Sequence, residues 1–256
     1  MWLNEIVLFL NTSLAVFFFF KFIFAFNPGE HHLRTVDGFE QEAAIEKFFK
    51  HPRYNVTCRY NYDVALLKLN RTLKYNNRVG PVCLPESDFP SHSNCFVTGW
   101  GTTENSPQTQ SQVRSSTKLG KVKNTGKIRK RQEKGNIYGL DTNVSNVYPL
   151  NQQILKEAKL PLVSHDTCRK SLNDLRRFGY CVTKRMRCAG YARGGVDACR
   201  GDSGGPLVCH RNRKWYLMGV VSWGDGCGLV GRYGVYADVL RLKRWIQETI
   251  QDASEE

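Results

Sequence analysis

The chain has 256 residues, of which 41% are hydrophobic, and it contains 37 Lys and Arg against 23 Asp and Glu. This length and apolar fraction can bury one large core or two small ones, which excludes a wholly disordered chain. About half of the net charge of +14 lies in residues 111–148, where nine basic residues accompany two acidic ones. The charge is therefore local, and it does not by itself indicate a nucleic-acid partner.

The chain begins with an apolar segment, residues 6–26, that is close to the length needed to cross a bilayer. We expect residues 1–28 to act as a membrane tether or an uncleaved signal. A signal peptide normally has a basic start and a small-x-small cleavage site, but here Glu5 occupies the start and no such site precedes Pro28. The segment favours a secreted or membrane-anchored protein over a cytosolic one.

Most of the remaining apolar runs are short, β-branched or aromatic, and bounded by Gly, Pro or Asn, which predicts antiparallel β-strands. The segment from about residue 108 to 149 is polar and basic without apolar periodicity, which predicts a surface insertion. Polyanion binding by this insertion is the alternative reading. The predicted strands are residues 64–69, 95–98, 158–163, 215–221 and 234–239.

One helix is predicted near the C-terminus. Leu242, Trp245, Ile246 and Ile250 recur at helical spacing on one face, so this helix should dock against a barrel. An acidic tail of residues 251–256 follows it.

Nine cysteines indicate an oxidising compartment. Zinc binding is the rival explanation, but no Cys-x-x-Cys pair occurs. Sequons for N-glycosylation begin at Asn11, Asn55, Asn70 and Asn143, as in an exported glycoprotein.

The most informative stretch is residues 197–207, which read D-A-C-R-G-D-S-G-G-P-L. A serine hydroxyl held there can be a nucleophile, and the glycines let the backbone turn with positive φ close to a substrate carbonyl. Their N–H groups could stabilise an oxyanion. A simple glycine-rich loop is the alternative, because these residue types favour turns for local reasons.

Four further motifs accompany this stretch: residues 63–69 (D-V-A-L-L-K-L), 99–101 (G-W-G), 222–224 (S-W-G) and 234–236 (G-V-Y). Together the five motifs resemble those of the trypsin-like, chymotrypsin-fold serine endopeptidases. The resemblance covers about residues 29–108 and 149–250. It implies an all-β fold of two antiparallel six-stranded barrels with a C-terminal helix, forming one peptidase domain over residues 29–250.

A serine peptidase needs a nucleophile, a base and an acid that orients the base. By resemblance, Ser203 is the nucleophile and Asp63 the orienting acid, and the N–H groups of Gly201 and Ser203 form the oxyanion hole. The family's base histidine lies in an Ala-Ala-His-Cys turn, and here the apolar N-terminal segment occupies that position. We therefore expect an incomplete first barrel and a nearly inert chain.

None of the six histidines takes the place of this base, and all are assigned to structure. We interpret the chain as a fragment, or a wrongly predicted product, of the gene for a working peptidase.

Asp202 matches the family aspartate that pairs with a newly freed N-terminal amine and so orders the oxyanion hole. No Ile-Val-Gly-Gly-like start occurs here, so we expect Asp202 to lack its cation, as in a zymogen.

Four residues match the substrate-binding positions of the family. Asp197 corresponds to the acid at the bottom of the specificity pocket, which implies cleavage after Arg or Lys. Gly224 and Gly234 correspond to the pocket walls and leave room for a long side chain. Ser222, with Gly224, would present backbone groups to an extended substrate strand.

The resemblance also implies disulfides between Cys95 and Cys209, Cys168 and Cys188, and Cys199 and Cys227. Cys83 matches a cysteine that tethers a pro-segment or upstream domain. Cys58 and Cys181 depart from the common pattern, and sequence leaves their partners open.

Glu30, Asp37 and Glu40 match a calcium loop of the family, although a solvated acidic turn is the alternative. No cofactor or metal is predicted. The expected partners are protein or peptide substrates and serpin or Kunitz-type inhibitors, and no nucleic acid. Two other functions remain open: a non-catalytic homologue that binds peptides, and a membrane-anchored protein that binds polyanions.

Overall fold

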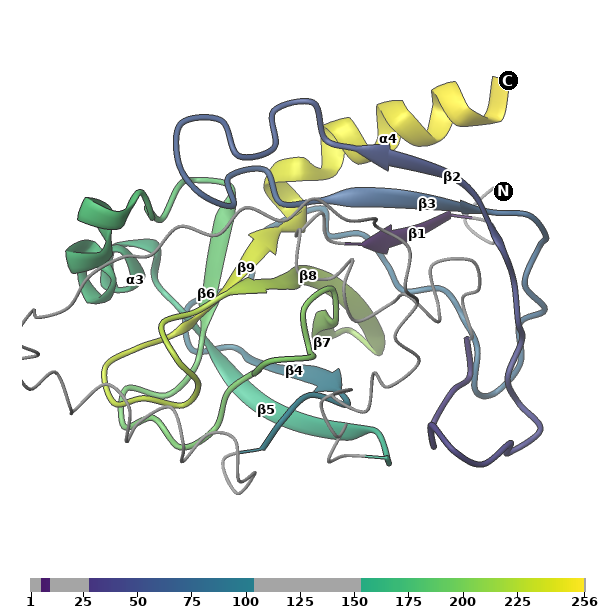
Figure 1. Ribbon diagram of the computed structural model, residues 1–256, viewed down its shortest axis with the longest axis horizontal. Helices are drawn as coiled ribbons and strands as arrows, with labels where there is room; N and C mark the ends of the chain where they lie inside the picture. The colour runs from purple at the N-terminus through teal and green to yellow at the C-terminus, as the bar shows by residue number, and fades with distance from the viewer. Residues whose placement is uncertain (1–5, 10–27, 104–152, 256) are drawn as a thin grey trace, which may run out of the picture.

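The computed structural model describes residues 6–9, 28–103 and 153–255, and for residues 6–9 the backbone alone. Within these ranges the chain forms a small antiparallel sheet, a closed six-stranded barrel and a long C-terminal helix (Figure 1). The predicted fold class is confirmed. Where the first barrel is expected, the described residues form a sheet of three strands.

This smaller sheet has the strand order β1-β3-β2, with β1 at Ile6–Phe9, β2 at Ile45–Lys50 and β3 at Ala65–Leu69. Both strand pairs are antiparallel. β3 is the central strand of this sheet. Four of its five residues are buried, as expected of a strand covered on both faces.

Four residues of the apolar N-terminal segment thus lie in β1, and most of the segment lies outside the described residues. In the described ranges, no helix has the length and apolar character required to cross a membrane. The tether stays a prediction, as does any role of the basic insertion, which also lies outside these ranges.

The larger unit is a barrel closed in the order β4-β5-β6-β9-β8-β7, and each neighbouring pair is antiparallel. Its interior is filled by fully buried side chains, among them Leu160, Leu207, Met218 and Tyr236. The bounds are β4 Asn94–Gly99, β5 Lys156–Val163, β6 Met186–Ala189, β7 Pro206–Arg211, β8 Lys214–Trp223 and β9 Gly234–Asp238.

The C-terminal helix α4, Val239–Glu255, packs against β8 and β9 through the predicted apolar face (Figure 1). Leu242 and Ile246 are 3% and 2% exposed and share one cluster with Val64 and Leu66, beside and within β3. This cluster joins the smaller sheet to the barrel. Residues 251–255, predicted as an acidic tail, belong to this helix.

Two short helices were not predicted: α3 at His165–Ser171 and the 3₁₀ helix η1 at Asn173–Phe178. Neither is long enough for an apolar stripe to show in the sequence. The signal that was present is the N-cap of α3, where the Ser164 hydroxyl accepts a hydrogen bond from the Thr167 N–H.

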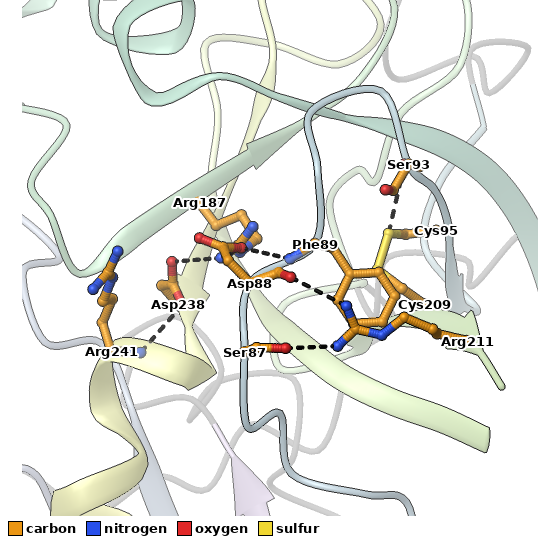
Figure 2. Close-up of polar contacts among 10 residues, drawn as sticks. All are labelled: Ser87, Asp88, Phe89, Ser93, Cys95, Arg187, Cys209, Arg211, Asp238 and Arg241. Carbon is orange, nitrogen blue, oxygen red and sulfur yellow. Dashed lines mark hydrogen bonds and ion pairs between the residues drawn. A yellow bond between two sulfur atoms is a disulfide. The ribbon is translucent and has the colours of Figure 1, made fainter.

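The linker between the two halves is fastened to the outside of the barrel by arginines (Figure 2). Arg187 pairs with Asp88 at 2.7 Å and with the buried Asp238 at 3.0 Å. Arg211 donates to the Ser87 hydroxyl at 2.9 Å and to the Asp88 carbonyl at 3.3 Å. The smaller sheet is therefore held in a fixed position relative to the barrel, and so is the acid that precedes β3.

Candidate active site

Asp63 lies directly before β3 and is almost fully enclosed, with 1% of its surface exposed. Its Oδ2 atom accepts a hydrogen bond of 2.6 Å from the Ser222 hydroxyl. Ser222 lies in β8 at a bulge, where the ladder to β9 skips from Val221 to Trp223. Because a bulge re-aims a side chain, and because a hydroxyl bonds strongly to a carboxylate, Asp63 is a buried acid in a fixed orientation.

The loop before Asp63 is bound to the barrel in two ways. The amide of Asn61, 2% exposed, donates to the Val56 carbonyl at 2.9 Å and accepts from the Thr183 hydroxyl at 2.9 Å. Cys58 and Cys181, whose partners the sequence left open, form a disulfide across 123 residues. A cross-link of this kind typically contributes about 2–4 kcal/mol of stability. Both contacts fix the position of Asp63.

Ser203 lies in a tight turn between the two glycines Gly201 and Gly204, whose φ angles are +97° and +87°. Such angles favour glycine, because other residues would be strained there. Gly204 donates its N–H to the Val221 carbonyl at 3.0 Å. Val221 and Ser222 are neighbours in β8. Val221 accepts from the turn of Ser203, and Ser222 donates to Asp63, so one strand connects this turn to Asp63.

The backbone N–H groups of Gly201 and Ser203 form no hydrogen bond within the described ranges. Two such donors on one turn make a concave site for an anion. They can stabilise the negative oxygen that develops when a carbonyl is attacked.

His51 is the histidine nearest in sequence to Asp63, and it is enclosed by aromatic rings. It is 6% exposed, with ring centroids 4.5 Å from Tyr62 and 4.7 Å from Trp245. Burial, followed by the nearby Arg53 and Arg185, lowers its pKa to about 4. His51 is therefore a neutral core residue.

The other five histidines also make structural contacts. Within the described ranges the Ser203 hydroxyl has no hydrogen bond to any of them. Their contacts are His31 with Asp37, His32 with the Arg34 N–H, His92 with the Leu162 carbonyl, His165 with the Thr183 carbonyl and His210 with the Trp215 ring.

Asp202 is largely buried, and its carboxylate is held by backbone donors. The Gly101 N–H donates to Oδ1 and the Cys199 N–H to Oδ2, both at 2.8 Å. Among the described residues it has no ion pair. Burial raises the pKa of Asp202, and the two hydrogen bonds oppose that shift.

Asp197 accepts hydrogen bonds from the Ala198 N–H at 2.9 Å and the Gly228 N–H at 3.1 Å. Burial raises the pKa of Asp197 to about 6, and the charge of Asp202 acts in the same direction. A Cβ added to Gly234 would lie 2.6 Å from Asp197 Oδ1, so only a glycine allows β9 to approach this carboxylate so closely. Gly224 lies exposed after the end of β8. This arrangement can receive a cationic side chain.

A cavity of about 310 Å³ extends along Asp197 and Asp202. It is lined by β4, β5 and the segment of residues 195–202, including both Asp197 and Asp202. Ser203, Ser222, Gly224 and Gly234 do not line it. The cavity therefore reaches the Asp197 carboxylate but not the other residues expected to contact a substrate.

The three disulfides implied by the resemblance are bonded in the structure: Cys95 to Cys209, Cys168 to Cys188 and Cys199 to Cys227. The first fastens β4 to β7, and the third joins the turn before Ser203 to the loop after β8. Cys83 is a free, half-buried thiol. Four disulfides are typical of a protein folded in an oxidising compartment.

Two of the carboxylates that match the family's calcium loop serve as turn caps. Glu40 accepts from the N–H groups of Asp37 at 2.6 Å and Gly38 at 2.8 Å, which lowers the pKa of Glu40. Glu30 accepts from the N–H groups of His31 and His32, both at 3.1 Å. In the described ranges no three acidic, His or Cys side chains are grouped to hold a metal ion.

Asp63 and the segment that carries Asp197 and Ser203 are thus both hydrogen-bonded to β8 or to the loop after it. A protein-family model described as Trypsin matches residues 25–146 and 123–246, so the chain belongs to the trypsin family.

Two curated relatives are similar over most of the chain. Transmembrane protease serine 5 of Homo sapiens is 36% identical over 215 residues, which cover 83% of this chain and 37% of the relative. Coagulation factor XI of Bos taurus is 33% identical over 209 residues, which cover 81% of this chain and 26% of the relative. The chain therefore spans about a third of the length of these relatives. Its membership of a family of serine proteases supports a protease function.

Three features of the site were not predicted from the sequence. They are the hydroxyl contact of Ser222 with Asp63, the anchoring of the loop by Asn61, and the position of Lys156 in the wall of the cavity. The run of aromatic and polar residues before Asp63 was the available signal for Asn61, since a buried amide there must be satisfied internally.

Proposed function

We propose that the chain carries the site of a serine endopeptidase that cleaves after Arg or Lys through an acyl-enzyme. The observation that supports this most is the half-buried Asp197 carboxylate, held by two backbone N–H groups and packed closely against Gly234. A desolvated carboxylate selects a cation, and a guanidinium fits it with two hydrogen bonds. The extended substrate backbone would lie along Ser222, which the ladder from β8 to β9 skips, and Gly224, which follows β8.

In this proposal the Ser203 hydroxyl attacks the scissile carbonyl carbon, and the former carbonyl oxygen becomes an anion. The N–H groups of Gly201 and Ser203 donate to that oxygen. The hydroxyl proton must pass to a base and then to the leaving amine, which departs as the ester to Ser203 forms; water later hydrolyses this ester. Asp63 would orient the base.

A second function is favoured by the histidines, which all make structural contacts away from Ser203. With these residues the chain would bind peptides far better than it cleaves them, and it would act as a non-catalytic homologue. Both functions predict the same pocket ligands, including arginine-presenting inhibitors of the serpin or Kunitz type. Secretion, or a tether through residues 6–26, would bring the site to extracellular peptides.

Binding of p-aminobenzamidine, an aromatic cation, tests the pocket through its pH dependence. The amidinium requires the ionised form of Asp197, whose pKa is raised to about 6 by burial. We expect a constant dissociation constant above about pH 7, and a loss of affinity of about tenfold per pH unit well below pH 6. The measurement is a fluorescence titration at a series of pH values between 4.5 and 8.

Benzamide, which has the same shape without the charge, is the control ligand and should bind weakly at every pH. An affinity for p-aminobenzamidine that is flat from pH 5 to 8 would argue against a carboxylate at the bottom of the pocket.

A further inference from the structure

Asp202 needs a cation, and the cavity behind it contains one. Its carboxylate is held by the N–H groups of Gly101 and Cys199 but has no ion pair in the described ranges. A buried carboxylate without a cation is unfavourable. Of the described side chains that line the cavity, Lys156 is the only positively charged one. Lys156 is exposed and makes no ion pair within the same ranges.

The strand register places Lys156 beside this carboxylate. Lys156 is the residue of β5 directly opposite Gly99 of β4. Directly opposite residues of antiparallel strands point to the same face, with Cβ positions about 4.5–5.5 Å apart. A Cβ added to Gly99 would collide with the carboxylate of Asp202, so that face is the one on which Asp202 lies. The four-carbon stem of lysine is flexible, so its ammonium can turn toward the carboxylate.

We propose that Lys156 is a positioning residue that pairs with Asp202 and so holds the turn carrying the N–H groups of Gly201 and Ser203. The inference rests on the proposed function, because the turn matters only if it serves a substrate. In the family that this chain resembles, a freed N-terminal amine fulfils this role after cleavage. A lysine on β5 lets the chain order the same turn without such a cleavage.

The other lysine of β5, Lys159, does not share the cavity with Asp202. Lys159 is also exposed in β5, but it pairs with Phe96 and does not line the cavity. It is therefore a matched control. Glu157 and Asp197 also line the cavity and are the carboxylates that could compete for the ammonium. Glu157 is the sequence neighbour of Lys156, so its side chain leaves the strand on the opposite face. Asp197 is held by the Ala198 and Gly228 N–H groups, and the substitution of Asp202 in the test below separates the two aspartates.

The test is a double-mutant cycle in the full chain, with Lys156→Met and Asp202→Asn alone and together. Thermal unfolding is measured on each variant, and p-aminobenzamidine affinity on the same samples. We expect Lys156→Met to lower the melting temperature by about 2–4 °C and the affinity about tenfold when Asp202 is present, and to change neither when Asp202 is Asn. Lys156→Arg should retain both properties, and Lys159→Met should match the unaltered chain.

Equal effects of Lys156→Met in both backgrounds, or no effect in either, would overturn the pairing. The two readouts separate this proposal from the proposed function. If unfolding shows the coupling but the folded chain binds no p-aminobenzamidine, the pairing stands and the pocket assignment fails. If the ligand binds but neither readout shows coupling, the pocket stands and the pairing fails.

Discussion

This 256-residue chain is expected to hydrolyse an Arg-amide substrate about a million-fold more slowly than a trypsin-family peptidase with a complete triad. Loss of the base histidine in another serine peptidase costs about six orders of magnitude in kcat. Here His51 is enclosed between Tyr62 and Trp245, and the other five histidines contact residues other than Ser203. A fluorogenic Arg-amide, assayed with both proteins side by side, measures the difference.

Ser203→Ala supplies the control for this assay. A nucleophile without its base contributes little, since the two act as a unit. The substitution should therefore leave the slow residual rate within about twofold. A fast rate in the unaltered chain that Ser203→Ala abolishes would show that a base reaches Ser203, and the non-catalytic function would then be wrong.

Replacing Asp197 by Asn should weaken p-aminobenzamidine binding by at least about 30-fold at pH 8. Removing one partner of a desolvated charge pair costs about 2–5 kcal/mol, and each 1.4 kcal/mol is a factor of ten in affinity. The Asn side chain keeps the shape of the carboxylate but not its charge. Titration of both proteins by ligand fluorescence gives the ratio.

Asp166→Asn is the matched control, because Asp166 is an exposed residue of α3 that pairs with Arg169. It should bind the cation as the unaltered chain does. Benzamide should bind Asp197→Asn no more weakly than it binds the unaltered chain. Retention of p-aminobenzamidine binding by Asp197→Asn would place the cation site elsewhere.

Much of the fold could be predicted, because its strands have patterns that are visible locally. The five predicted strands and α4 are all present, with ends shifted by a few residues. Some of the missed elements are short: β6 has four residues and α3 seven, and such lengths carry no clear period. β2 and β7 have six residues each and were missed because charged residues interrupt or end their apolar runs.

The candidate site divides in the same way. The turn of Ser203 could be predicted because its glycines and acid are neighbours in sequence. The Cys58–Cys181 disulfide and the contact of Asn61 with Thr183 each join residues more than 120 positions apart, so only the folded chain shows them. The role proposed for Lys156 could not be predicted for a similar reason. Its position in the same cavity as Asp202 depends on the register with Gly99, which the sequence alone does not specify.

We propose that one cleft holds a cation at Asp197 and a carbonyl group at the turn of Ser203. A crystal structure of the chain with a short peptide ending in a free arginine carboxylate tests both parts at once. We predict that the guanidinium donates two hydrogen bonds to Asp197 and that a carboxylate oxygen accepts from the N–H groups of Gly201 and Ser203. A peptide bound elsewhere, or an empty cleft at saturating peptide, would contradict the claim.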